Sequence, residues 1–336
     1  MTTANAVTST DEPEVLTSVN VGVGRIELNR PKAINALSLP MLTAIHQTLR
    51  EWREDEKVTS VEFSGRGLRG FCSGADVRWL RTAVLDDPAL GDEFFAVEYP
   101  LNADIATYPK PISALMDGIT MGGGLGLTLH TGRRVGTTTT QLAMPEVTIG
   151  LFPDVGATFE LSRMPGETGT WMAMTGASID ASSALWAGLL DETDELPTHP
   201  DDSWLATAQS WIDECFLGND PVAIITRLEA HDHPDARAAG ELIRTKAPLS
   251  VAAALELVRR AAQLPDVAAV LGVDAVLARN FIRRPDFAEG VRAQLVDKDK
   301  SPTWSHQRLE DVSVAEVQAM FTAPSADELV AQAETS

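Results

Sequence analysis

The region from Val15 to Asp191 alternates short apolar runs with helix-like periods, and this alternation constrains the fold more than any other feature. Val21–Leu28 alternates in the manner of a strand, whereas Leu37–Arg53 spaces its apolar residues as a helix does. Val58–Phe63 and Ile112–Met116 are further apolar runs of strand length. Strands that alternate with helices are typical of the α/β class, which the sequence therefore predicts.

A different pattern follows the acidic stretch Asp191–Ser203, which carries two prolines and is the predicted boundary. Beyond it we expect mainly helices, over Trp204–Phe216, Pro221–Leu228, Ala236–Thr245 and Leu249–Gln263. The expected organisation is a core over residues 14–195 and a helical C-terminal region over 196–321. The polar ends, residues 1–13 and 322–336, are expected to be flexible tails.

The charge balance bears on possible partners. The chain has 27 Lys and Arg against 48 Asp and Glu, a net charge of −21. A field this negative opposes binding to nucleic acid or to an anionic membrane, so we expect neither partner. No apolar run reaches the roughly 18 residues of a membrane span. Cys72 and Cys215 cannot form a disulfide framework, and the first basic residue is Arg25, so we expect a cytoplasmic protein.

Several common site motifs are absent from the sequence. It contains no G-x-S-x-G, no H-E-x-x-H, no paired C-x-x-C and no G-x-x-x-x-G-K-[ST]. The glycines at positions 22 and 24 lie inside a strand pattern, whereas a dinucleotide fingerprint needs them after the strand. His231 and His233 are close together but lie in a loop-like segment. We therefore expect no metal site and no cofactor.

Two glycine-rich turns, Ser64–Val77 and Asp117–Leu127, each follow a predicted strand. A long surface loop would explain the first turn, and tight packing of a helix on the sheet would explain the second. Taken together, they predict backbone N–H groups that converge on one point. Such a pair forms an oxyanion hole for the carbonyl of an acyl compound.

The segment Met144–Gly156 places two carboxylates, Glu146 and Asp154, among apolar residues. Buried carboxylates are costly unless they are paired or functional, and burial raises a carboxyl pKa toward the range useful for a general base. The alternatives are that Glu146 caps a helix or pairs with an arginine, and that Asp154 begins a turn after Pro153.

Several motifs in order resemble a known superfamily. They are Asn29–Leu37 (NRPKAINAL), Phe71–Asp76 (FCSGAD), Gly118–Leu127 (GITMGGGLGL) and Met144–Glu146 (MPE). Their order is similar to that of the crotonase, or enoyl-CoA hydratase/isomerase, superfamily. Glu98–Asn102 (EYPLN), Ile149–Gly156 (IGLFPDVG) and the segment Arg284–Trp304 resemble in particular its 3-hydroxyisobutyryl-CoA hydrolase family. The resemblance covers roughly residues 15–321.

The resemblance implies a crotonase spiral of ββα units with a helical C-terminal part, and an acyl-CoA thioester as substrate. It implies an oxyanion hole made by the amides of Ala75 and Gly123, and catalysis by Glu146 and Asp154. Glu98, Gly123, Glu146 and Asp154 match substrate-binding positions. Lys32, Ala33 and Ile34 match a loop that binds CoA. Lys298 and Lys300 would meet CoA phosphates or form a solvated pair, and Asp76 would fix its turn.

The implied reaction is hydrolysis of 3-hydroxyisobutyryl-CoA to 3-hydroxyisobutyrate and CoA, in valine catabolism. Hydratases of the superfamily carry a glutamate just after the triple glycine, where this chain has Gly126. Two alternatives stay open: a hydratase or isomerase with altered acid–base residues, and a non-catalytic acyl-CoA-binding protein. Relatives often form trimers or hexamers, so a homo-oligomer is the expected assembly.

Overall fold

The computed structural model describes residues 12–194 and 198–323. Nearly all of the two predicted tails lies outside these residues. The strands are β1 (Val15–Asn20), β2 (Val23–Leu28), β3 (Ser60–Gly65), β4 (Ile112–Met116), β5 (Ile119–Met121), β6 (Arg133–Gly136), β7 (Gln141–Ala143), β8 (Ile179–Asp180) and β9 (Glu192–Thr193).

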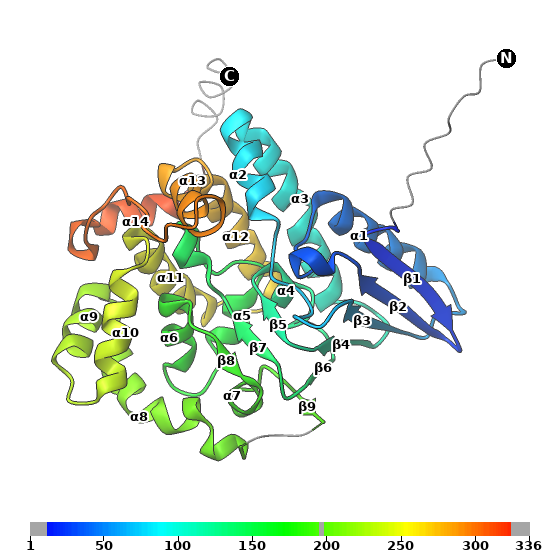
Figure 1. Cartoon of the computed structure of the whole chain (residues 1–336), viewed down its shortest axis with the longest axis horizontal. Helices are drawn as coiled ribbons and strands as arrows, with labels where there is room; N and C mark the ends of the chain where they lie inside the picture. Colours follow the sequence, from blue (N-terminus) through cyan, green and yellow to red (C-terminus); the bar gives the residue numbers. More distant parts are fainter. Residues whose placement is uncertain (1–11, 195–197, 324–336) are drawn as a thin grey trace.

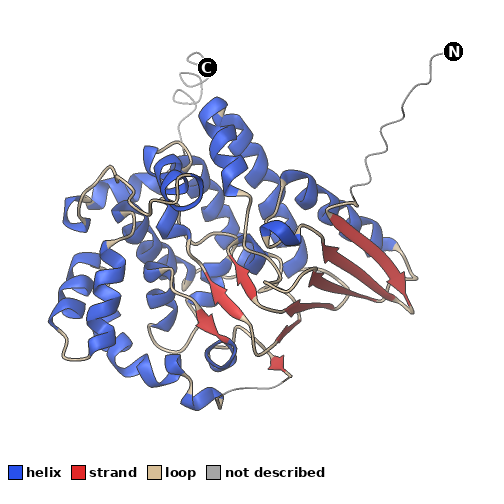
Figure 2. Cartoon of the chain, viewed as in Figure 1, coloured by secondary structure: helices blue, strands red, loops and turns tan. Residues whose placement is uncertain are grey.

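The α-helices of the described residues cover the strands on several sides (Figures 1 and 2). They are α1 (Leu39–Glu54), α2 (Val77–Asp86), α3 (Pro88–Ala106), α4 (Gly123–Gly126), α5 (Ala157–Leu161), α6 (Thr168–Thr175), α7 (Ala181–Trp186), α8 (Trp204–Phe216), α9 (Pro221–Ala230), α10 (Pro234–Arg244), α11 (Pro248–Ala261), α12 (Val267–Phe281), α13 (Pro285–Val291) and α14 (Val314–Met320).

The strands form two sheets. The larger has the order β1-β2-β3-β4-β6-β9, parallel except for the antiparallel β1–β2 hairpin. The smaller has the order β5-β7-β8, in which β5 and β7 are parallel. The α/β class is thus confirmed. Parallel neighbours bring the ends of β3 and β4 to the same edge of the sheet, where both glycine-rich turns begin.

The local predictions match the observed elements closely. Ile112–Met116 and Trp204–Phe216 are observed with the predicted bounds, and α1 begins two residues after the predicted start. The predicted strand Val21–Leu28 is wrong at its start. Val21 and Gly22 form the turn of the β1–β2 hairpin, with φ of +47° and +82°. An apolar residue at a hairpin turn imitates the alternation of a strand.

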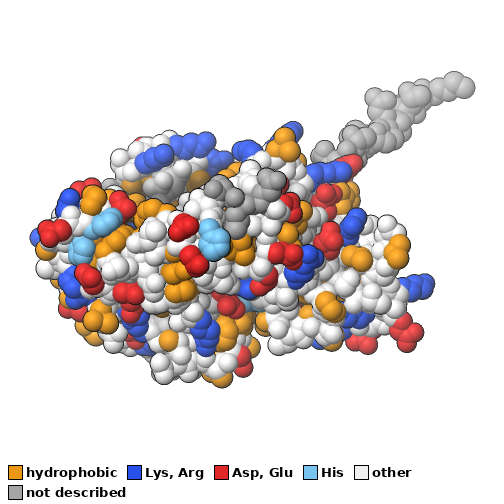
Figure 3. Space-filling model, turned by 90° about the horizontal axis from the view of Figure 1, so that it is seen from below, with side chains coloured by type: hydrophobic (Ala, Val, Ile, Leu, Met, Phe, Trp, Pro, Cys, Tyr) orange, Lys and Arg blue, Asp and Glu red, His pale blue; other side chains and the backbone are white. Residues whose placement is uncertain are grey.

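The helical C-terminal region packs back onto the core. α12 packs against α3, and α13 packs against α2 (Figure 1). The predicted boundary Asp191–Ser203 contains β9, which joins the edge of the larger sheet. Acidic and basic side chains are interspersed on the face seen in Figure 3. No helix within the described ranges is long and apolar enough to cross a membrane.

Two glycines allow α13 to approach the one-turn 3-10 helix η2 (Glu146–Ile149) backbone to backbone. A Cβ at Gly290, on α13, would lie 2.5 Å from the Ile149 backbone. A Cβ at Gly150, which has a φ of +71°, would lie 2.4 Å from the Asp286 backbone. Because backbone cannot move aside as a side chain can, this contact fixes η2 and hence Glu146.

We expect Gly290→Ala to destabilise the protein by about 1–3 kcal/mol, because its methyl group would overpack this contact. The matched control is Gly272→Ala on α12, since apart from its own helix backbone and chain neighbours no described atom lies within 4 Å of the Cβ position there. That change should stabilise the protein by roughly 0.5–1 kcal/mol, the gain of alanine over glycine in a helix. Urea unfolding measures both, and equal effects of the two changes would contradict the proposed contact.

Candidate active site

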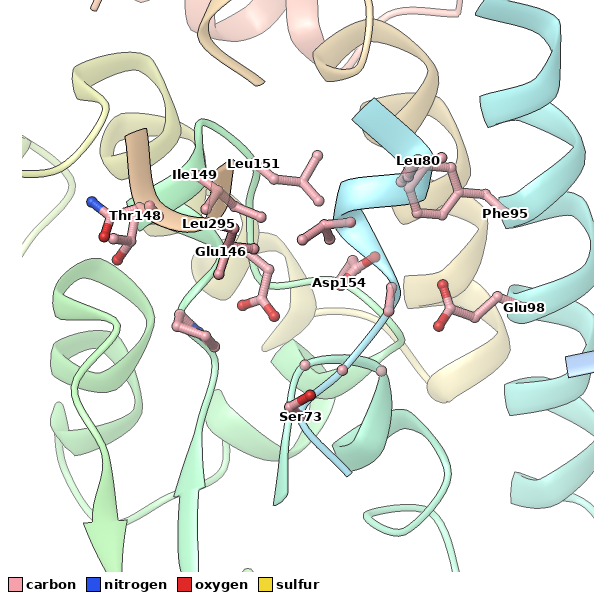
Figure 4. Close-up of a pocket in the computed structure, with 17 residues that line it drawn as sticks. Ser73, Leu80, Phe95, Glu98, Glu146, Thr148, Ile149, Leu151, Asp154 and Leu295 are labelled. Carbon is pink, nitrogen blue, oxygen red and sulfur yellow. The ribbon is translucent and has the colours of Figure 1, made fainter. Parts of the chain in front are cut away.

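A cavity of about 240 Å³ lies between α2 and α3 on one side and the segment Pro145–Asp154 on the other. Figure 4 shows Glu98 and Glu146 reaching into it from opposite sides, with Asp154 between them. Most of the wall is apolar. The lining residues are Ser73, Gly74, Ala75, Val77, Leu80, Phe95, Glu98, Gly122, Gly123, Pro145, Glu146, Thr148, Ile149, Leu151, Asp154, Gln294 and Leu295.

Two backbone amides meet at this cavity. Leu37 forms a parallel β-bridge with Ala75. The Leu37 N–H donates to Gly74 O and the Leu37 carbonyl oxygen accepts from the Asp76 N–H, both at 2.8 Å. The N–H of Ala75 therefore has no acceptor among the described residues. Gly123 begins α4, so its N–H also lacks an acceptor there. A Cβ on Gly123 would lie 3.4 Å from the Ala75 nitrogen, so the two residues whose amides lack an acceptor lie close together.

Two glycines of this turn lie directly beside carboxylate oxygens. A Cβ at Gly122 would lie 2.8 Å from Oε1 of Glu146, and a Cβ at Gly123 would lie 2.6 Å from Oε1 of Glu98. Gly122 also has a φ of +50°. The second glycine-rich turn thus lies close to two acidic side chains.

The three acidic side chains come from different elements. Glu98 lies on α3, Glu146 begins η2, and Asp154 precedes α5. Their exposed fractions are 1%, 7% and 5%, respectively. Glu98 Oε1 and Glu146 Oε2 have no hydrogen-bond partner within the described residues, whereas Asp154 Oδ2 accepts from the Tyr99 hydroxyl at 2.9 Å. Neither an arginine partner nor a helix-capping bond accounts for the Glu146 carboxyl.

Burial and mutual repulsion perturb all three carboxyl groups. Burial raises the pKa of Glu98 well above its ordinary value, and the nearby Asp154 raises it further. Burial and then the charge of Asp154 do the same to the pKa of Glu146. Burial raises the pKa of Asp154 to about 7, although the Tyr99 hydrogen bond lowers it. Groups this close titrate together, and raised carboxyl pKa values of this kind are common at acid–base sites.

The predicted CoA loop lies beside the cavity rather than in its wall. Lys32 and Ala33 are exposed, in a one-turn 3-10 helix, and Ile34 is half-buried. Ser73, which lines the cavity, donates from its hydroxyl to Ala33 O at 3.2 Å and from its amide to Ile34 O at 2.9 Å. The loop therefore forms the outer side of the wall that Ser73 lines.

The remaining residues singled out in the sequence lie outside the cavity wall. Asp76 caps α2 and pairs with Arg30 at 3.0 Å, which fixes its turn. Lys298 and Lys300 are exposed, shortly after the lining residue Leu295. His233 caps α10. The described residues include no cluster of three or more His, Cys, Asp or Glu able to hold a metal.

Sequence reasoning missed part of the wall. Leu80 and Phe95 line the cavity from α2 and α3, where helical periodicity marks them only as buried. Gln294 and Leu295 enter it from a π-helical turn, Arg292–Val296. The wider π turn changes which side chains face inward, and periodicity gives no signal for it. Tyr99 lies within the motif Glu98–Asn102, which was the available signal.

Comparisons with known proteins agree with this geometry. The enoyl-CoA hydratase/isomerase family model matches residues 23–195 and 189–321. The chain is 34% identical to the mitochondrial 3-hydroxyisobutyryl-CoA hydrolase of Gallus gallus, covering 89% of this chain and 86% of the relative. It is 34% identical to 3-hydroxyisobutyryl-CoA hydrolase 1 of Arabidopsis thaliana, covering 94% and 93%.

Solved structures share the fold under other names. A carnitinyl-CoA dehydratase from Mycobacterium thermoresistibile has a TM-score of 0.88 and 40% identity, covering 95% of this chain and 98% of that one. An enoyl-CoA hydratase from Rhodobacter sphaeroides 2.4.1 has a TM-score of 0.88 and 38% identity, covering 93% and 98%. The expected crotonase fold is confirmed.

One prediction is wrong. The Gallus gallus and Homo sapiens relatives are named as mitochondrial, which contradicts the predicted cytoplasmic location. The prediction rested on two cysteines and on the position of the first basic residue. A low cysteine count indicates a thiol-reducing environment and does not distinguish one such compartment from another.

The family match spans the core and the C-terminal helices alike, and the matched region contains the whole cavity wall. The chain therefore belongs to the enoyl-CoA hydratase/isomerase, or crotonase, family, and its curated relatives include the 3-hydroxyisobutyryl-CoA hydrolases.

Proposed function

We propose that the protein hydrolyses 3-hydroxyisobutyryl-CoA to 3-hydroxyisobutyrate and CoA, a step in the breakdown of valine. Curated relatives at 32–34% identity carry the name of this activity. The observation that carries the proposal is the meeting of two acceptor-free amides with a buried glutamate around one cavity. Thioester hydrolysis consumes only the ester and water, so the proposal includes no metal or cofactor.

The thioester carbonyl oxygen would accept hydrogen bonds from the N–H groups of Ala75 and Gly123. As the carbonyl carbon becomes tetrahedral, negative charge develops on this oxygen. Donors fixed in advance in a water-poor pocket stabilise that charge, and one such donor contributes about 3–4 kcal/mol to lowering the barrier.

Glu146 would act on the carbonyl carbon in one of two ways. Its carboxylate either attacks the carbon and expels the CoA thiolate, leaving an anhydride that water cleaves, or it takes a proton from a water that attacks instead. The products are the same. A raised pKa makes the Glu146 carboxylate a stronger base once it is ionised.

Asp154 and Glu98 would surround the acyl group. The Asp154 carboxylate would accept a hydrogen bond from the substrate 3-hydroxyl, with Tyr99 holding its other side. Glu98 would line the same pocket. Lys32, Ala33 and Ile34 would bind CoA outside the wall, and Lys298 and Lys300 would meet its phosphates. A trimer or hexamer is the assembly that the family resemblance favours.

A hydratase or dehydratase is the second candidate, because two similar solved structures carry those names. The structure around Gly126 argues against it. A Cβ there would lie 2.7 Å from the Val155 Cβ and 2.9 Å from the Asn102 amide nitrogen, so a side chain at this position has no room. The glutamate that hydratases carry at this place therefore has no counterpart above the cavity.

We expect Glu146→Gln to lower CoA release from (S)-3-hydroxyisobutyryl-CoA by roughly 10²–10⁴-fold, the usual contribution of a positioned base or nucleophile. A thiol-release assay measures this loss. The control is Glu160→Gln, because Glu160 is half-buried on α5 and does not line the cavity. A Glu146→Gln variant that releases CoA as fast as the wild type would refute the assignment of Glu146.

Assays of the wild-type protein separate the candidate functions. Hydration of crotonyl-CoA by the wild type would favour the second candidate, and tight binding of the CoA ester without turnover would favour a non-catalytic protein.

We expect Asp154→Asn to slow hydrolysis of 3-hydroxyisobutyryl-CoA more than that of isobutyryl-CoA. Only the first ester carries the hydroxyl that the carboxylate would accept, and a lost hydrogen bond to a charged group costs about 1.5–3 kcal/mol. The ratio of kcat/KM for the two esters is the measurement. Equal losses on both esters would exclude this role of Asp154.

The activity should depend on pH near neutrality. Because the pKa of Asp154 is raised to about 7, its carboxylate forms as the pH rises through 7, and kcat/KM should increase over this range. Tyr99→Phe removes a hydrogen bond that lowers this pKa, so the rising limb should move to higher pH. A kcat/KM that falls as the pH rises through 7 would contradict this prediction. So would a rise of kcat/KM that occurs at lower pH in Tyr99→Phe than in the wild type.

A further inference from the structure

The turn that carries Asp154 has a strained backbone. Val155 has a φ of +55°, in the left-handed region that a β-branched residue rarely adopts, and Gly156 follows with a φ of +73°. Strain of this kind persists only where surrounding contacts impose it. The groups that hold this turn therefore decide where the Asp154 carboxyl group points.

The half-buried His130 and the fully buried Asp274 hold the turn by its backbone. Nε2 of His130, which follows α4, lies 2.9 Å from Val155 O, and the Gly156 N–H donates to Oδ2 of Asp274 at 2.8 Å. A carbonyl oxygen only accepts, so His130 Nε2 carries a proton. Because burial lowers the pKa of His130 to about 4, the ring is neutral at pH 7. Burial, and then the charge of Asp154, raises the pKa of Asp274 well above its ordinary value.

Burying the Asp274 carboxyl group at this place costs folding stability. It lies on α12, its side chain is fully buried, and its Oδ1 has no partner within the described residues. The titratable groups close enough to act on its charge are Asp154, on the turn, and Tyr99, on α3, whereas His130 contacts the turn at Val155 O. No arginine or lysine among the described residues pairs with it. A buried carboxyl group without a cation lowers stability, so packing does not explain its presence.

We propose that Asp274 is a positioning residue for Asp154: by holding the Gly156 amide, it fixes the strained turn so that the Asp154 carboxyl faces the cavity. This inference rests on the proposed function, in which Asp154 receives the substrate hydroxyl. It also gives α12, in the C-terminal region, a direct part in shaping the site. Asp274 itself does not line the cavity.

The test compares variants that keep or lose the acceptor for Gly156. Asp274→Ala and Asp274→Ser are too short to reach the amide, whereas Asp274→Asn keeps an acceptor oxygen at the same place. The first two should lower kcat on 3-hydroxyisobutyryl-CoA by roughly 10–100-fold, the effect of a displaced catalytic group. Asp274→Asn should restore kcat to within about threefold of the wild type.

A double variant separates positioning from a general loss of structure. If Asp274 acts through Asp154, then adding Asp274→Ala to Asp154→Asn should lower kcat by no more than about twofold. The control is Asp213→Ala, because Asp213 accepts the Glu167 amide at 2.7 Å in the same manner and does not line the cavity. It should lower the melting temperature and leave kcat unchanged.

Amide hydrogen exchange gives a readout that needs no substrate. Peptides covering residues 154–157 should exchange faster in Asp274→Ala and Asp274→Ser, but not in Asp274→Asn. Unchanged exchange, fully additive losses in the double variant, or no rescue by asparagine would each overturn the proposal. If the wild type releases no CoA from 3-hydroxyacyl esters, the proposed function fails, and the exchange comparison still decides whether Asp274 holds the turn.

Discussion

The burial of three carboxyl groups against a turn of glycines is the constraint on which the rest of the site depends. Carboxylate oxygens of Glu98 and Glu146 occupy the places where side chains of Gly123 and Gly122 would be. The absence of Cβ atoms there allows acidic groups to lie close to two free amides. The same closeness removes water, and the loss of water raises the carboxyl pKa values.

Holding these groups together requires structure from both ends of the chain. α13 contacts η2 through Gly290 and Gly150, and α12 supplies Asp274 to the turn after Asp154. The C-terminal helices therefore hold in place the segments that carry Glu146 and Asp154. The three carboxyl groups of the site themselves lie in the first half of the chain. A rigid support matters because small displacements of a catalytic group are costly to the rate.

In the proposed function, the position of the second acid distinguishes this site from that of a hydratase. The triple glycine is followed by Gly126, and Asn102 and Val155 fill the space above it. The second carboxyl group comes instead from Asp154, on a strained turn on another side of the cavity. Addition of water across a double bond needs two acid–base groups over the same bond. The proposed thioester hydrolysis needs only one carboxylate near a polarised carbonyl, a role that the proposal gives to Glu146.

The sequence by itself determined the class of fold and most element positions, and its resemblance to a known family supplied the site residues that the proposed function uses. Ile112–Met116 and Trp204–Phe216 followed from local periodicity, which is a short-range property of the chain. The family resemblance carried by the ordered motifs indicated Ala75 and Gly123, and it agreed with the interest of Glu146 and Asp154 as carboxylates in an apolar segment.

Only the tertiary structure decided what surrounds those residues. The π-helical turn that brings Gln294 into the cavity, the left-handed Val155 and the bond from Gly156 to Asp274 all depend on contacts between distant segments. Asp274 lies 118 positions beyond its partner, in a helix whose local pattern marks it only as one residue among apolar neighbours. Contacts of this kind arise from packing in three dimensions, and the spacing of residues along the chain carries no record of them.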